Sequence, residues 1–121
     1  MATLLRRAGT TAILDVSGKL ALGDGVDDFR SKWTEALTTG CKNVVVNLAQ
    51  VPMIDSSGMG SMIRCHAAAV AHHGRVKLVG ANDTVRNALQ ITHLDAVFDF
   101  YEDEAAALAS LAPVAASAHK G

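Results

Sequence analysis

One short segment holds the residue types best suited to chemistry. It reads Asp55-Ser56-Ser57-Gly58 and lies between a run of valines and a helical pattern. A helix start has free backbone N–H groups and the positive end of a dipole, so one of these side chains can cap the helix while another hydroxyl points outward. From these residues alone, the segment is either a plain helix cap or a cap that also presents a serine.

Two glycines distinguish the segment from a plain cap. Gly58 and Gly60 fall at the start of the expected helix, where each glycine costs up to about 1 kcal/mol relative to alanine. Glycine is favoured where another group comes close to the backbone. We therefore expect a close contact here with a neighbouring strand, a protein surface or a phosphate.

The elements that must position this segment follow from alternating hydrophobic periods. Strands are predicted at residues 3–7, 12–18, 43–48, 75–80 and 96–101, and helices at residues 25–39, 59–73, 82–91 and 102–111. The resulting order is β-β-α-β-α-β-α-β-α. It predicts an α/β fold in a single domain, with a mixed, mostly parallel sheet of about five strands and four helices.

Local signals refine this outline. Asp24 is expected to cap the first helix, Gly40 to end it, Asn82 to cap the third helix and Pro113 to end the last. One face of the second helix is marked by residues, all but one of them apolar, that recur at spacings of three and four. They are Met59, Met62, Ile63, His66, Ala67 and Val70.

The strand at residues 43–48 is β-branched and apolar on both faces. This pattern is typical of a central strand that is covered on both sides. In open α/β sheets, functional groups collect beyond the carboxyl ends of the strands. The Asp55 segment follows this strand, so it is expected at that end of the sheet.

Composition limits the class of protein. The chain has 121 residues, of which 50% are apolar and 19% charged, and its net charge is −1. These values fit one folded domain, expected at residues 3–111 with a flexible tail at 112–121, and they argue against a nucleic-acid partner. No apolar run is long enough to cross a membrane and the start lacks a secretion signal, so we expect a cytoplasmic protein with no membrane partner.

Other candidate groups are interpreted as structural, so no metal and no cofactor is expected. The cysteines are expected as reduced thiols in or near the core, and the histidines lack the spacing of metal ligands on one helix face. Two glycines fit a helix-entry turn, and the tryptophan fits core packing. These residues are Cys41, Cys65, His66, His72, His73, Gly23, Gly25 and Trp33.

The segment VVVNLAQVPMIDSSGMGSMI resembles the phosphorylatable loop of the STAS domain family, specifically that of bacterial anti-sigma factor antagonists. Two further segments, VSGKLALGDGVDDFR and GRVKLVGANDTVRNALQITHLDAVFDFYEDEAAAL, are similar to other parts of the family, so the resemblance runs from about Thr3 to Leu111. Met59 stands where leucine is usual. Methionine preserves an apolar contact there.

This resemblance implies a phosphoprotein of bacterial signal transduction that switches between partners. In its unphosphorylated form it would bind an anti-sigma factor that is also a serine kinase with a histidine-kinase-like ATPase fold, and so release a sigma factor for transcription. The kinase would phosphorylate Ser56, and a PP2C-type phosphatase would remove the phosphate. The other residues implied in partner binding are Met53, Asp55, Ser57, Gly58, Met59 and Gly60.

Phosphate at Ser56 would change the contact surface by about −1.5 to −2 charges, while the helix start favours an anion. We therefore expect the fold to survive modification and the interface to be lost. The alternative is a non-switching STAS adaptor in a transport or signalling complex. An enzyme with a nucleophilic serine is not expected, because the G-x-S-x-G elbow is absent and no histidine can be tied to Ser56 or Ser57.

Overall fold

The computed structural model describes residues 2–112. The tail expected at residues 112–121 therefore lies, apart from Ala112, outside the described residues, as does the helix stop expected at Pro113. The chain forms β1 (Ala2–Ala8), β2 (Thr11–Ser17), α1 (Asp24–Thr38), β3 (Asn43–Gln50), α2 (Ser56–Ala71), β4 (Val76–Val79), α3 (Asp83–Ile91), the short 3-10 helix η1 (Leu94–Ala96), β5 (Asp99–Tyr101) and α4 (Glu104–Leu111).

The five strands form one sheet in the order β1-β2-β3-β4-β5. β1 and β2 are an antiparallel hairpin, and the pairs β2–β3, β3–β4 and β4–β5 are parallel. The predicted α/β fold, with a mixed sheet and four α-helices, is confirmed. β3 is the central strand as expected, because its β-branched residues are covered on both faces.

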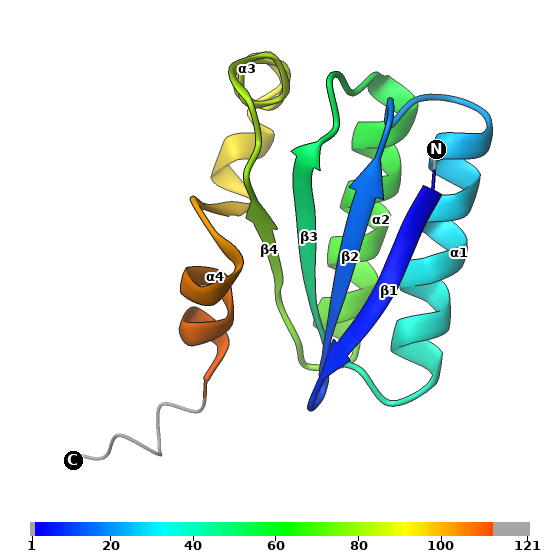
Figure 1. Cartoon of the computed structure of the whole chain (residues 1–121), viewed down its shortest axis with the longest axis vertical. Coiled ribbons are helices and arrows are strands. Elements are labelled where there is room, and N and C mark those ends of the chain that lie inside the picture. Colours follow the sequence, from blue (N-terminus) through cyan, green and yellow to red (C-terminus); the bar gives the residue numbers. More distant parts are fainter. Residues whose placement is uncertain (1, 113–121) are drawn as a thin grey trace.

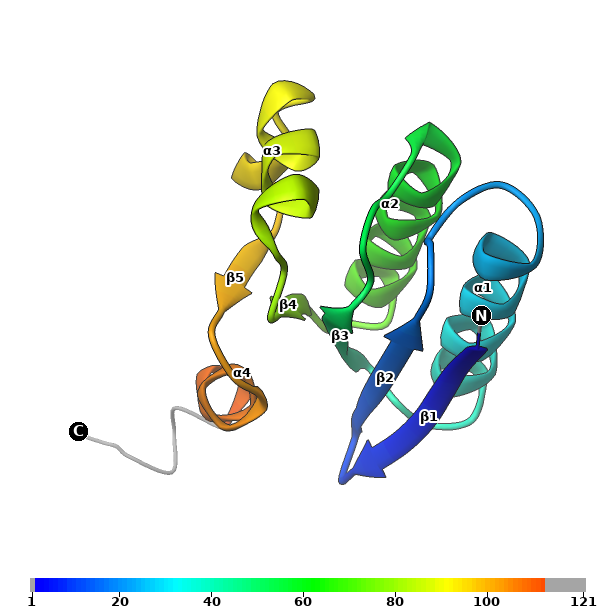
Figure 2. The ribbon, with the colours of Figure 1, turned by 45° about the horizontal axis from the view of Figure 1, so that its top comes forward.

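The two faces of the sheet are covered unequally (Figures 1 and 2). α1 and α2 cover one face together with α3, and there Val44, Val46 and Leu48 of β3 enter the main core. α4 lies on the other face, where Val45 joins a smaller cluster that includes Ala107. Alternate residues of one strand thus serve two cores, as the two-residue period of a strand requires.

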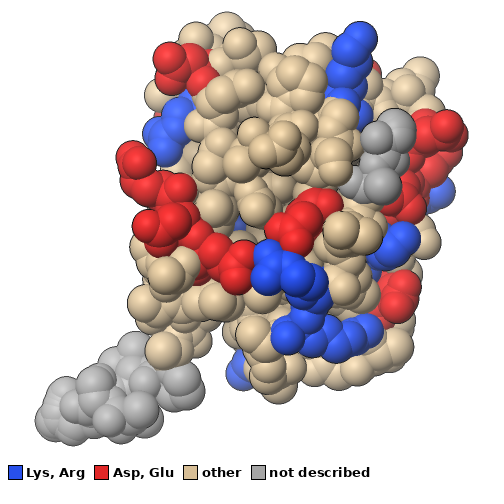
Figure 3. Space-filling model, in the orientation of Figure 1, with Lys and Arg blue, Asp and Glu red and all other residues tan. Residues whose placement is uncertain are grey.

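The face that carries α4 also carries ion pairs. Arg6 of β1 lies 2.6 Å from Asp15 of β2 and 2.6 Å from Glu104 at the start of α4. Figure 3 shows this face, with blue and red side chains adjoining in a band across it. The network links α4 to the antiparallel hairpin.

Three sequence predictions need correction. Asp24 is the first residue of α1 and not its cap, because the chain enters through Gly23 at φ 109°, a conformation that favours glycine. The strand predicted at residues 96–101 begins later, at Asp99, and Ala96 belongs to η1 instead.

Two other local predictions are confirmed. Asn82 caps α3, because it accepts a hydrogen bond from Val85 N, and Gly40 follows the end of α1 with φ 109°.

The third correction concerns the buried face of α2. Its buried residues are Gly58, Ser61, Met62, Cys65 and Ala69, whereas Ile63 and Val70 are 43% and 46% exposed. Small side chains on this face let α2 pack close to the rest of the core. The buried face of the helix is therefore not the face that carries Ile63 and Val70.

The tryptophan and both cysteines are buried in the core, as predicted. Trp33 is buried, and its Nε1 donates to Ser61 Oγ at 3.3 Å. Cys41 and Cys65 are buried free thiols. Burial raises the pKa of the Cys65 thiol to about 12, so this group is a poor nucleophile at neutral pH.

Candidate functional site

The start of α2 is held by one carboxylate. Asp55 precedes α2, and its Oδ1 accepts from Gly58 N at 2.9 Å while its Oδ2 accepts from Leu22 N at 3.0 Å. These two backbone hydrogen bonds, that from Gly58 first, lower the pKa of the Asp55 carboxyl below its usual value. Asp55 therefore caps the helix and also fixes the loop between β2 and α1.

That loop runs beside the chain that enters α2. Leu20 N donates to Met53 O at 3.1 Å, and Asp55 N donates to Leu20 O at 3.3 Å. A Cβ atom at Gly58 would lie 2.1 Å from Leu20 O. Gly58 is thus required by the approach of this backbone carbonyl, and the close contact expected from the sequence is made within the chain.

Gly60 has a different environment. A Cβ atom there would meet nothing nearer than Arg64 Nη1 at 3.8 Å. The fold of the described residues does not require a glycine at this position. At Gly60 the helix backbone is therefore not closely packed by other parts of the described chain.

The two serines are not equivalent. Ser56 is exposed as the first residue of α2, whereas Ser57 is half-buried. The first turn of α2 contains no acidic residue. Ser56 therefore presents a neutral hydroxyl at a helix start, where the free N–H groups and the dipole can accommodate an anion.

Apolar side chains surround Ser56. Met53 and Met59 are half-buried, whereas Met62 is buried in the core. A shallow hollow beside Ser56 is lined by Met59, Gly60, Ile63, Thr92 and Leu94.

The sequence did not point to several neighbours of Ser56. Leu22 is 80% exposed, and its N–H is one of the two backbone groups that donate to the Asp55 carboxylate. Thr92, which follows α3, and Leu94, the first residue of η1, also line the hollow. The loops before α1 and α2 and the helix α3 are distant in sequence but lie at the same end of the sheet (Figure 1).

Residues 2–112 contain no group of three or more histidine, cysteine, aspartate or glutamate residues placed to hold a metal ion. None of their helices combines the length and the apolar character that a membrane span needs.

Solved structures show the same fold. An anti-sigma factor antagonist (STAS) domain protein from Planctomyces limnophilus has a TM-score of 0.82 at 19% identity, covering 93% of this chain and 100% of that chain. An anti-sigma factor antagonist from Mycobacterium paratuberculosis has a TM-score of 0.78 at 18% identity, with coverages of 93% and 94%. The Bacillus cell fate determinant SpoIIAA in its phosphorylated form has a TM-score of 0.71 at 22% identity, with coverages of 90% and 99%.

The curated proteins include no match to this sequence. The model of the STAS domain, in contrast, matches residues 3–107. This range includes all five strands except Ala2, the loops before α1 and α2, and Ser56. The chain belongs to the STAS domain family.

Proposed function

We propose that this chain is an anti-sigma factor antagonist whose binding is switched by phosphorylation of Ser56. In the unphosphorylated form it binds an anti-sigma factor with serine kinase activity and a histidine-kinase-like ATPase fold, and a sigma factor is released. Phosphorylation by that kinase ends the binding, and a PP2C-type phosphatase restores it. The protein itself acts by binding and not as an enzyme.

One observation carries this proposal. Ser56 is an exposed, neutral hydroxyl at the start of α2, and Asp55 holds that start without using the serine. A kinase can reach such a hydroxyl. The phosphorylated form of SpoIIAA, which shares the fold, shows that a protein of this architecture can carry phosphate.

The surface around Ser56 explains how a phosphate would act. Ser56 borders a hollow with apolar side chains from α2 and η1, including Met59, Ile63 and Leu94. A phosphoserine would bring about −1.5 to −2 charges and a strongly hydrated group to this border, close to Asp55. An apolar partner surface would then have to desolvate the phosphate, which weakens binding.

The remaining predicted site residues divide into two roles. Asp55 and Gly58 build the site, because they fix the helix start against the loop that contains Leu20 and Leu22. Gly60 and the two methionines contact the partner, and Ser57 is an accessory hydroxyl. The partner-binding residues are thus Met53, Met59 and Gly60 beside Ser56.

The test is affinity capture with the full chain from an extract of the source cells. Wild type and Ser56→Ala are expected to retain a protein that binds ATP and phosphorylates serine, whereas Ser56→Asp loses it. Capture of the same partner by all three forms would contradict the switch. Capture of a transporter's ATPase subunit instead would favour the alternative, a non-switching STAS adaptor.

A further inference from the structure

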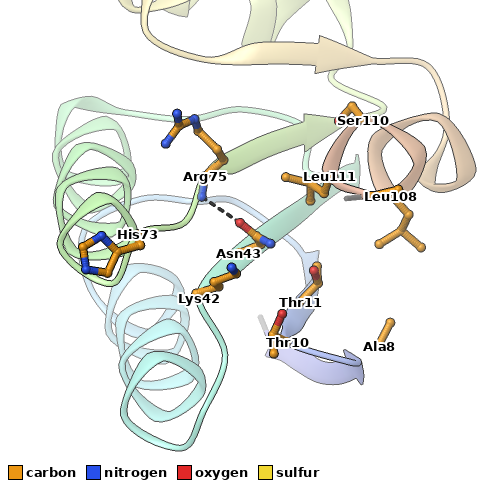
Figure 4. Close-up of a pocket in the computed structure, with 11 residues that line it drawn as sticks. Ala8, Thr10, Thr11, Lys42, Asn43, His73, Arg75, Leu108, Ser110 and Leu111 are labelled. Atoms are coloured by element: carbon orange, nitrogen blue, oxygen red, sulfur yellow. Dashed lines mark hydrogen bonds between the residues drawn. The ribbon is translucent and has the colours of Figure 1, made fainter. Parts of the chain in front are cut away.

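A second hollow lies at the opposite end of the sheet from Ser56. It has a volume of about 650 Å³ and is bounded by the end of β1, the starts of β2 and β3, the turn before β4 and the last turn of α4. Figure 4 shows the residues around it. The proposed partner surface at Ser56 does not use any of them.

Two buried side chains offer unused polar groups to this hollow. Asn43 and Thr11 are only 8% and 7% exposed, and both line the hollow. Asn43 Oδ1 accepts from Arg75 N at 2.9 Å, which identifies the other side-chain atom as the Nδ2 amino group. Neither Asn43 Nδ2 nor the Thr11 hydroxyl has a hydrogen-bond partner within residues 2–112. Among the described residues, only His66 Nδ1 is a fully buried side-chain polar atom without a partner, so Asn43 Nδ2 and the Thr11 hydroxyl are open to the hollow. Both groups can therefore donate a hydrogen bond to an acceptor bound there.

The charge of the lining has one sign. Lys42, His73 and Arg75 border the hollow, and none of its lining residues is acidic. No carboxylate of the described chain lies within ion-pair distance of Lys42 or Arg75. Arg75 Nη1 donates to Gly74 O at 3.2 Å, which leaves its positive charge without a carboxylate partner. Two such cations beside the Asn43 amide favour an anion.

The walls of the hollow differ in character. Figure 4 shows Lys42, His73 and Arg75 on one side, and Leu108 and Leu111 of α4 on the other. Pockets for small molecules typically combine apolar walls with a few polar groups that orient the ligand. This hollow therefore suits a molecule with an anionic end and an apolar body.

We propose that this hollow binds a small organic anion. The Asn43 amide and the Thr11 hydroxyl donate hydrogen bonds to its anionic group, Lys42 and Arg75 neutralise the charge, and its apolar body lies on Leu108 and Leu111. The site is separate from Ser56, so the proposal does not depend on the partner switch.

The probe for a test is 8-anilinonaphthalene-1-sulfonate, which combines a sulfonate with an apolar body and fluoresces on binding. The full chain is titrated with it, and the contact is located by amide shifts in a ¹H–¹⁵N spectrum. We expect saturable binding and shifts at Thr11, Asn43 and Leu111. N-phenyl-1-naphthylamine, which has no anionic group, should bind at least tenfold more weakly.

The decisive variant is Asn43→Asp. It keeps the oxygen that accepts from Arg75 N but replaces the donor to the ligand by a negative oxygen, so we expect at least a tenfold loss of probe affinity. Asn87→Asp makes the same charge change at an exposed position of α3 and should bind as wild type does. Retained binding by Asn43→Asp would overturn the proposal.

A second variant distinguishes loss of binding from unfolding of the protein. Lys42 and Arg75 are exposed, so Lys42→Gln/Arg75→Gln should keep the thermal midpoint while binding the probe at least tenfold more weakly. Lys19→Gln/Arg30→Gln removes two exposed cations elsewhere and should have no effect on binding. Shifts confined to Met59 and Ile63, or no binding at all, would refute the site.

Discussion

The start of α2 differs from the starts of α3 and α4, although all three use the same capping device. Asp55, Asn82 and Asp103 each precede a helix and accept a hydrogen bond from the backbone N–H three residues later. α3 then begins with Asp83 and α4 with Glu104, whereas the first turn of α2 has no acidic residue.

This difference shows what a phosphate would do at Ser56. A negative group at a helix start is favourable, and α3 and α4 carry one permanently. A phosphoserine at the start of α2 would give this helix the same feature. Phosphorylation should therefore not destabilise the fold. The effect of the phosphate should be confined to the surface that a partner contacts.

The largest expected effect sharpens this contrast between fold and surface. Ser56→Asp should weaken binding of the captured kinase by about 100-fold or more, because a misplaced charge at an interface costs about 3 kcal/mol. Its free energy of unfolding should change by less than about 1 kcal/mol. Calorimetric titration and urea unfolding measure the two quantities.

The matched control for Ser56→Asp is Thr84→Asp, which places the same charge in the first turn of α3 at an exposed residue. It should leave kinase binding unchanged. Equal losses of affinity in the two variants would mean that overall charge, and not the position of Ser56, governs binding.

A second prediction separates the two glycines of α2. Gly58→Ala places a Cβ atom against Leu20 O and should destabilise the protein by about 2 kcal/mol or more. Gly60→Ala makes only an ordinary contact with the Arg64 side chain and should raise stability by about 0.5–1 kcal/mol, since alanine is the better helix former. Urea unfolding of both variants checks this order, and equal effects would contradict the packing described at Leu20.

Gly60→Ala also probes the partner surface. If a partner approaches the open backbone at Gly60, the added methyl group should weaken kinase binding by about tenfold while the fold becomes more stable. Unchanged affinity in the calorimetric titration would exclude Gly60 from the interface.

A smaller effect is expected at the cap. Asp55→Ala removes the acceptor for Gly58 N and Leu22 N and should lower the free energy of unfolding by about 1 kcal/mol. Asp55→Asn keeps one acceptor oxygen and should cost less. If the two variants lost the same stability, the hydrogen bond to Gly58 would not be the stabilising contact.

The smallest expected effect is a dependence on pH. The pKa of Asp55 is lowered in the folded protein, so its ionised form stabilises the fold above the pKa of an unfolded aspartate, about 4. That contribution is lost as the pH falls through the lower, folded pKa. The stability difference between wild type and Asp55→Asn should therefore shrink from pH 7 to pH 3 in urea unfolding, and a constant difference would contradict the assignment.

The sequence predicted those features that depend on local patterns. The central strand β3 follows from its run of β-branched residues, and the Asn82 cap follows from the residue type before a helical period. Local patterns also predicted a capped helix start with one outward hydroxyl in the Asp55 segment, whereas the choice of Ser56 came from the resemblance to the family.

Features that depend on tertiary contacts could not be predicted. The reason for Gly58 is a carbonyl of Leu20, far away in sequence, and the hollow beside Ser56 needs Leu94. The face of α2 that is buried was predicted wrongly, because close packing of small residues outweighed the apolar periodicity that includes Ile63 and Val70.

The most direct measurement is the mapping of phosphate by mass spectrometry after the full chain has been incubated with the captured kinase and ATP. The exposure of Ser56 and the partial burial of Ser57 predict a single phosphate on Ser56 and none on Ser56→Ala. Phosphate on Ser57, or a wild-type chain left unmodified by a kinase that binds it, would contradict the switch.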